Sequence, residues 1–324
     1  MDSTRMFVEK VKEFDPSLKT EEIYQALRNV WIMNSLQIYL NLDVKYLDSI
    51  FAYSMIYPYI DNYLDSPSES IEEKLSFLKK LKDWLEGQDV PFGNSQEEKI
   101  YRLIKMVEKQ YDRRSFPGVY QSLLSIFNAQ LKSLAQQRNE CLPLEIDILD
   151  LSFEKGGTSV LADGFLVNGL LDDRQADFCF GFGVFLQLAD DIQDINEDRE
   201  NNHATIFSQA AGKYDLDKLA NKLFNFIAEV VDLKLDKKAA NENTLGELII
   251  KNCYFLVMEA LGRNDAYYSK AYIRKIQRYF PVRFAVLKKL RREIEKKILE
   301  KRKNVTELDF ISAFLLTLAS RTIS

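Results

Sequence analysis

The sequence of 324 residues contains few turn-forming residues and few of the residues used in histidine or cysteine chemistry. It has only 12 glycines and 7 prolines, which disfavours a β architecture with many turns. Its one histidine, His203, nearly excludes a histidine-ligated metal site or a Ser-His-Asp triad. The three cysteines are far apart and odd in number, which predicts reduced, buried thiols rather than a disulfide framework.

Two further classes of protein are disfavoured by what the chain lacks. Its formal net charge is -5, whereas nucleic-acid-binding domains usually carry a basic patch. No uninterrupted apolar run reaches membrane-spanning length, and the N-terminal residues do not form a charged-then-apolar leader. We therefore expect a cytoplasmic protein that binds no nucleic acid and has no transmembrane segment. Peripheral membrane contact and a homodimer both stay open.

Apolar residues recur at helical spacing along nearly the whole chain, without a linker or a repeat. The pattern predicts one all-α domain over residues 1–324. The expected helices lie near residues 20–33, 35–65, 70–86, 96–113, 117–139, 146–170, 174–200, 214–233, 245–262, 265–280, 283–302 and 306–320.

One expected helix contains two adjacent glycines, Gly156 and Gly157. Each glycine costs about 1 kcal/mol relative to alanine in a helix interior. The pair therefore predicts an interruption, for which two interpretations stand side by side. One is a plain loop between two short helices. The other is a kink that exposes backbone N–H groups and Lys155 to an anion.

Acidic residues recur at helical spacing within residues 187–199. Asp190, Asp194 and Asp198 would lie on one face of a helix, where like charges repel. The strongly apolar run at 178–185 precedes them, so these carboxylates are expected at the inner end of a buried helix. Asp198, two turns on, is expected near the mouth and close to solvent. A hard divalent cation shared with substrate phosphates is the usual counter-charge for such a cluster.

A second acidic pair, Asp61 and Asp65, has the same spacing and follows the aromatic, apolar run at 50–56. Alone, such a pair arises readily by chance, because the chain has 49 aspartates and glutamates. Taken together, the two acidic segments predict helices that face each other across a cavity. Between them they would hold Mg²⁺, with Mn²⁺ as a substitute, and grip a diphosphate.

Both segments resemble the metal-binding motifs of class I isoprenoid synthases, the trans-prenyltransferases and terpene synthases. Residues 187–194 have the spacing Gln-x-x-Asp-Asp-x-x-Asp of the second trans-prenyltransferase motif. Residues 190–200 and 61–65 resemble the two motifs of the large-terpene synthases of the tetraprenyl-β-curcumene synthase type. The resemblance implies an isoprenoid-synthase-like helical bundle around a deep apolar cavity, with Mg²⁺ at its mouth.

The resemblance also implies roles for individual residues. Asp61 and Asp190 open the two motifs and would be the most important for catalysis. The implied metal ligands are Asp61, Asp65, Asp190, Asp194 and Asp198. The implied diphosphate-binding residues are Lys155, Thr158, Gln187, Arg199, Arg278 and Tyr279.

The activity implied is that of a Mg²⁺-dependent terpene synthase, which ionises a linear allylic prenyl diphosphate and cyclises the carbocation or eliminates a proton. Chain-elongating prenyltransferases have adjacent aspartates in the first motif, followed closely by two arginines and a glycine. Here Asn62 stands beside Asp61, and the paired arginines come only at 113–114. Condensation with isopentenyl diphosphate is therefore the second hypothesis. A non-catalytic partner subunit of an isoprenoid synthase is the third.

Overall fold

The computed structural model describes residues 2–65, 70–137, 147–234, 240–289 and 293. Within these residues it contains helices and no β-strand, which confirms the predicted all-α class. The expected helix at 306–320 and the end of that at 283–302 lie outside the described residues. The helices are α1 (Asp2–Phe14), α2 (Thr20–Tyr39), α3 (Asp48–Asp65), α4 (Ile71–Leu85), α5 (Ser95–Gln110), α6 (Pro117–Gln137), α7 (Ile148–Asn168), α8 (Asp173–Gln193), α9 (Ile195–Glu200), α10 (Ile206–Ala210), α11 (Asp217–Lys234), α12 (Ala240–Arg263), η1 (Asp265–Tyr267), α13 (Lys270–Ile276) and η2 (Gln277–Tyr279).

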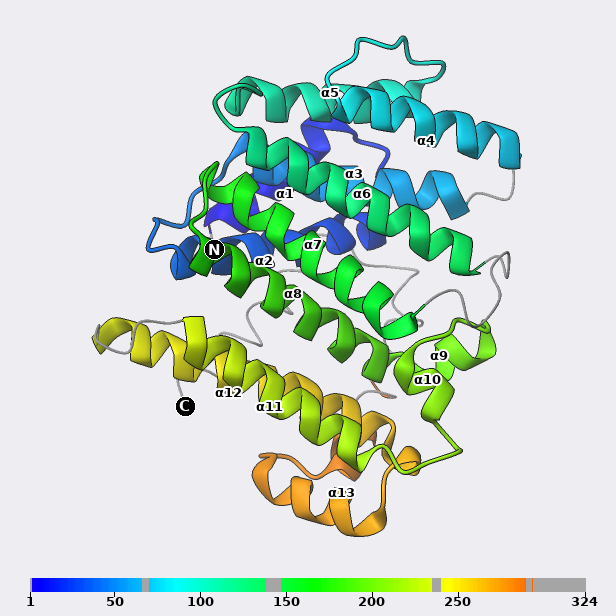
Figure 1. Ribbon diagram of the computed structural model, residues 1–324, viewed down its shortest axis with the longest axis vertical. Helices are drawn as coiled ribbons and strands as arrows, with labels where there is room; N and C mark the ends of the chain where they lie inside the picture. The colour runs from blue at the N-terminus through cyan, green and yellow to red at the C-terminus, as the bar shows by residue number, and fades with distance from the viewer. Residues whose placement is uncertain (1, 66–69, 138–146, 235–239, 290–292, 294–324) are drawn as a thin grey trace.

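Helices α7 and α8 lie in the middle of the arrangement (Figure 1). On one side α7 packs against α2, α3 and α6, and α5 and α4 follow beyond them. On the other side α8 packs against α11 and α12. One continuous apolar core runs through these layers, with Phe51, Phe77, Trp84 and Phe185 among its fully buried side chains.

Helix α7 is unbroken, so the interpretation of its adjacent glycines as a loop between two short helices was wrong. The reason is its contact with α8, through three residues that we call the glycine seam: Gly156, Gly157 and Gly183. A Cβ atom on Gly183 would lie 2.1 Å from the carbonyl oxygen of Gly156, and one on Gly157 would lie 2.4 Å from the ring of Phe180. The glycines let two backbones touch, and the packing gained offsets their low helix propensity.

Substituting Gly183 by alanine is expected to lower the free energy of unfolding by about 2–3 kcal/mol, because a methyl group at that contact forces α7 and α8 apart. Gly93→Ala is the matched control, since Gly93 is exposed and a Cβ atom there would lie 3.2 Å or more from its nearest neighbours, the side-chain ends of Lys80 and Glu97. Urea denaturation of both variants measures the difference. A Gly183→Ala protein as stable as the Gly93→Ala protein would contradict the close approach.

The sequence also joined two helices that the structure separates. Residues 40–47 form a connection between α2 and α3, where a helix over 35–65 was expected. Asn41 has a φ of 57°, a left-handed conformation that asparagine tolerates better than most residues. The Gln37 side chain then bonds both backbone groups of Lys45, at 3.0 and 3.2 Å, and closes the loop. Helix α1 was not predicted.

Candidate functional site

A polar pocket of about 470 Å³ lies where α7, α8 and α9 meet. It brings together Lys155 of α7 and most of the acidic segment, as the sequence predicted for Gln187, Asp190 and Asp194. The lining residues are Lys155, Gln187, Asp190, Asp191, Asp194, Glu197, Asp198, Asn201, Asn202 and His203.

Two neighbouring aspartates of α8 have different surroundings. Asp191 is buried and accepts hydrogen bonds from Gln187 Nε2 at 2.9 Å and Ser152 Oγ at 3.2 Å. Burial nevertheless raises the pKa of Asp191 to about 6. Since the Gln187 amide is bonded to Asp191, its role in the structure is to hold this carboxylate.

Asp190 opens into the pocket, and half of its side chain is exposed there. Its pKa is raised, first because the surrounding protein displaces part of its hydration and second because of the charge on Asp194. Arg28 of α2 and Lys155 oppose this shift, and the Arg28 Nη2 atom lies 3.8 Å from Asp190 Oδ1. Nothing in the sequence around Arg28 pointed to this contact.

The acidic segment is not one straight helix, contrary to the prediction of a helix over 174–200. Helix α8 ends at Gln193, and Asp194 has φ -100° and ψ 14°. Asn264 Nδ2 donates to the carbonyl oxygens of Ile192 at 2.7 Å and Gln193 at 3.1 Å, and its Oδ1 accepts from Asn196 at 2.9 Å. The break in the acidic segment is therefore held by a buried side chain from the end of α12.

The prediction that Asp198 lies close to solvent was wrong. Asp198 is 9% exposed. Its Oδ1 lies 3.1 Å from His203 Nδ1, and its Oδ2 accepts a hydrogen bond from Thr205 Oγ1 at 3.3 Å. The loop after α9 turns back over Asp198 and covers it, an arrangement that helical spacing could not reveal.

Two implied diphosphate-binding residues have partners elsewhere. Arg199 donates to the Tyr267 hydroxyl at 3.0 Å, and its guanidinium lies 5.4 Å from the centre of that ring. Thr158 is buried and donates to the carbonyl oxygen of Glu154, one turn back on α7, at 2.6 Å. Both side chains are thereby directed to contacts outside the lining of the polar pocket.

The Arg278–Tyr279 pair lies in η2, next to α13. The Tyr279 side chain is 69% exposed. Neither residue is among those that line the polar pocket. The resemblance of these two residues to a terpene synthase motif is therefore not matched by a position at this pocket.

Asp61 and Asp65 belong to the last two turns of α3, but their side chains lie outside the part of the chain that the structure describes. The run of α3 against α7 still limits where they are. Ser49 Oγ donates to the carbonyl oxygen of Leu166 at 2.7 Å. Two turns further along α3, Tyr57 is 3.1 Å from Ser159, two turns back on α7. The two helices therefore run antiparallel.

The same register can be followed by one more turn. On α3 this turn leads from Tyr57 to residue 61, and on α7 it leads from Ser159 to Lys155. Lys155 lines the polar pocket. Residue 61 of α3 and Lys155 of α7 thus occupy corresponding positions on two antiparallel helices.

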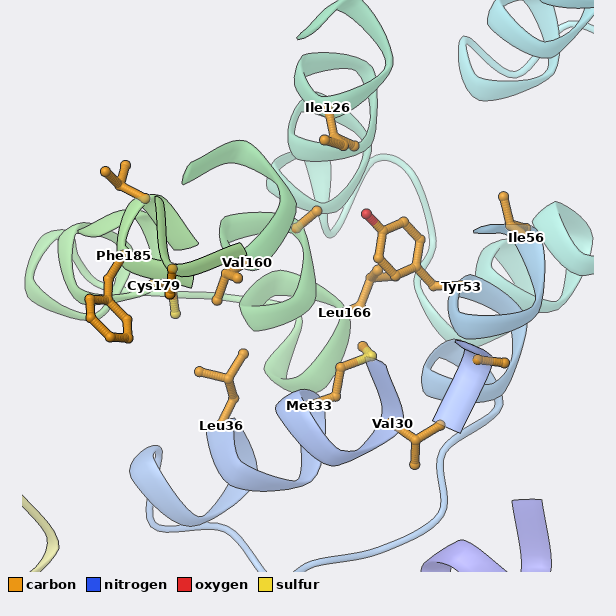
Figure 2. Packing of buried hydrophobic residues seen from close by; sticks show 14 of the residues in the cluster. Val30, Met33, Leu36, Tyr53, Ile56, Ile126, Val160, Leu166, Cys179 and Phe185 are labelled. Carbon is orange, nitrogen blue, oxygen red and sulfur yellow. The ribbon is translucent and has the colours of Figure 1, made fainter. Parts of the chain in front are cut away.

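A second, apolar pocket lies among α3, α4, α5 and α6. Its volume is about 70 Å³, and apart from Tyr53, Tyr57 and Gln130 its lining side chains are hydrocarbon. Tyr57 and Leu64 belong to this lining, so the pocket extends along α3 to its last turn. Figure 2 shows the ring of Tyr53 reaching from α3 toward the neighbouring helices, near Ile126 and Leu166.

A buried acid, Asp163, was missed by the sequence analysis. It is 0% exposed, and Asn29 Nδ2 lies 3.3 Å from its Oδ1. Its Oδ2 and the Tyr53 hydroxyl have no hydrogen-bond partner among the described residues. Burial raises the pKa of Asp163 to about 8. Its position inside the apolar stretch 160–167 was a signal that the sequence did offer.

Two features are absent from the described residues. In that part of the chain no group of three or more His, Cys, Asp or Glu side chains is arranged to hold a metal ion, and the side chains of Asp61 and Asp65 fall outside it. None of the helices described is long and apolar enough to cross a membrane.

Comparisons with known proteins leave the family open. No family model, no curated protein and no solved structure matches this chain. The resemblance to class I isoprenoid synthases therefore rests on the sequence motifs.

Proposed function

We propose that this protein is a Mg²⁺-dependent terpene synthase that ionises a linear allylic prenyl diphosphate and cyclises the carbocation or eliminates a proton from it. The observation that carries the proposal is the presence of two pockets of opposite character. One is the polar pocket, which we call the acidic pocket from here on, and the other is the apolar pocket. Tyr57, which lines the apolar pocket, contacts Ser159 of α7, one helical turn from Lys155 of the acidic pocket. A diphosphate suits the first pocket and a hydrocarbon chain the second.

The acidic pocket has the donor chemistry for Mg²⁺. Five carboxylates line it, whereas Lys155 is the only lysine or arginine among the described lining residues. Hard divalent cations prefer such oxygen ligands. Asp190 and Asp194 would be ligands in this pocket, joined by Asp61 and Asp65 from α3. When bound, Mg²⁺ supplies a Lewis acid and neutralises charge on the diphosphate.

The protein's own residues have separate tasks in this proposal. Lys155 contacts the diphosphate, which departs with both electrons of the broken C–O bond. The apolar pocket keeps water from the carbocation, and the faces of Tyr53 and Tyr57 attract it by about 0.5–2 kcal/mol. At about 70 Å³ the pocket is small. A cavity of about 150 Å³ holds benzene, so binding of a prenyl chain requires lining side chains to move.

Arg113 supports cyclisation or elimination over chain elongation. Condensation with isopentenyl diphosphate needs a second diphosphate site. Arg113 donates instead to the carbonyl oxygens of Leu85 at 2.6 Å and Trp84 at 2.9 Å, and to Glu108. It thus caps the end of α4 and is not free to bind a second diphosphate.

The experiment that tests the proposal is incubation with prenyl diphosphates of increasing length and Mg²⁺, with and without isopentenyl diphosphate, followed by product analysis. A hydrocarbon or terpene alcohol formed without isopentenyl diphosphate supports the proposal. Longer diphosphates formed only with isopentenyl diphosphate would favour a prenyltransferase. Absence of any product would favour the non-catalytic partner subunit. We further propose a cytoplasmic location, and light scattering on the purified protein tests the homodimer.

A further inference from the structure

His203 is the only histidine in the chain, and it lines the acidic pocket. The loop that carries it is firmly held. Its backbone N–H donates to the carbonyl oxygen of Asp198 at 2.7 Å, and its own carbonyl oxygen accepts from Ser208 Oγ at 2.8 Å. Asn202, just before it, has a φ of 56°, which turns the chain back toward α9. The imidazole is therefore placed at the pocket by the backbone.

Asp198 determines which ring nitrogen is available. Its carboxylate accepts hydrogen bonds and lies 3.1 Å from Nδ1, so Nδ1 carries a proton. Thr205 Oγ1 donates to the other oxygen of Asp198 and keeps the carboxylate in place. Nε2 has no protein partner among the described residues, and 30% of the histidine side chain is exposed. A carboxylate behind a histidine orients the ring toward a ligand on its far side.

The acidic pocket has few groups that can contact an anion. Lys155 is one, and Arg28 lies 3.8 Å from Asp190. The resemblance implied Arg199 as another, but Arg199 is bonded to Tyr267. Arg199 follows Asp198 directly in α9, so it points about 100° away around the helix axis. His203 instead returns to the pocket through the loop after α9.

We propose that His203 is a further contact for the diphosphate group, beside Lys155, and that Asp198 is the residue that positions it. Placed between a carboxylate and a diphosphate, the ring donates Nδ1–H to Asp198 and Nε2–H to a diphosphate oxygen. This inference rests on the proposed function. In it Asp198 orients the His203 ring and is not one of the metal ligands.

The test is calorimetric titration of the full-length protein with inorganic pyrophosphate in excess Mg²⁺. His203→Phe keeps a ring without nitrogens and is expected to weaken binding about tenfold or more, because a hydrogen bond to a charged group is lost. His203→Gln keeps an N–H donor and should recover part of the affinity. Lys213→Gln is the control, since it removes an exposed positive charge outside the pocket and should leave affinity unchanged. Circular dichroism melting confirms that each variant folds.

The double variant separates the two roles of Asp198. If Asp198 acts through His203, Asp198→Asn weakens binding several-fold alone and adds nothing to His203→Phe. If Asp198 is a metal ligand, the double variant binds more weakly than either single one, which would overturn its positioning role. The contact between His203 and the diphosphate would be overturned if the folded His203→Phe and His203→Gln proteins bind pyrophosphate as tightly as wild type. It would also be overturned if Arg199→Gln is the variant that loses affinity and the His203 variants do not.

Failure of the proposed function gives a different result. Asp190→Asn serves as the reference for the pocket. If wild-type protein binds pyrophosphate with Mg²⁺ and Asp190→Asn does not, the pocket is an anion site whatever His203 does. If wild-type protein shows no binding, the proposed function fails and the contact to His203 fails with it.

Discussion

Asp190→Asn is expected to abolish turnover of a prenyl diphosphate while the protein still folds. Asp190 faces the acidic pocket and begins the second acidic segment, and in the proposed function its carboxylate binds Mg²⁺. Asp61→Asn should have the same effect from α3. Product formation under saturating Mg²⁺ measures the loss, and a decrease of at least a thousandfold, roughly 4 kcal/mol in the barrier, is expected.

The stability of Asp190→Asn is the second measurement. The charge of Asp194 and partial burial both raise the pKa of Asp190, so a neutral amide relieves an unfavourable charge. The contact with Arg28 is half exposed and long, and its loss costs little. Urea denaturation should therefore show unchanged or slightly higher stability. If Asp190→Asn instead unfolds much of the protein, and the fraction that stays folded is still active, then Asp190 is a structural residue.

Raising the pH from 6 to 8 is expected to lower the free energy of unfolding by about 2–3 kcal/mol, through Asp163. The folded protein holds a proton on this buried carboxyl up to a pKa of about 8, whereas the unfolded chain releases it near pH 4. Between these values the folded state binds more protons than the unfolded state. The contribution of Asp163 to the free energy of unfolding is therefore complete below about pH 4, and it is lost as the pH rises to about 8.

The variant Asp163→Asn isolates this effect. An amide keeps the acceptor for Asn29 and does not ionise, so the pH dependence between 6 and 8 should largely disappear. Asp191→Asn is the matched control, because the pKa of Asp191 is raised only to about 6 and its contribution lies mostly below that window. Urea denaturation at both pH values gives the slopes. If the free energy of unfolding changes equally with pH in wild type and in Asp163→Asn, other groups cause the pH dependence.

The features that could be predicted from the sequence are those that depend on the spacing of residues along a single helix. The all-α class, the extent of α7 and the presence of Asp190 and Asp194 in one pocket follow from apolar and acidic residues at helical intervals. These features depend on residues a few positions apart, where helix geometry alone decides which side chains share a face.

What it could not predict depends on distant partners. The break at Asp194 is held by Asn264, some seventy positions later in the chain, and Asp198 is covered by a loop whose return depends on the left-handed Asn202. The glycines of α7 were judged by their propensity alone. Their true partner, α8, follows after a turn and reverses that judgement. Arg199 illustrates the same limit, because a neighbour in sequence of Asp198 faces a different part of the fold.

The glycine seam also decides which parts of the acidic pocket can be redesigned. Lys155 directly precedes Gly156, and Gln187 comes one turn after Gly183, so their separation is set by backbone contact between two helices. Amino-acid exchanges elsewhere in the core would leave this wall unchanged. A mutant library intended to admit a bulkier substrate should therefore spare the seam and the left-handed Asn202, and vary the exposed side chains of Glu197 and Asn201.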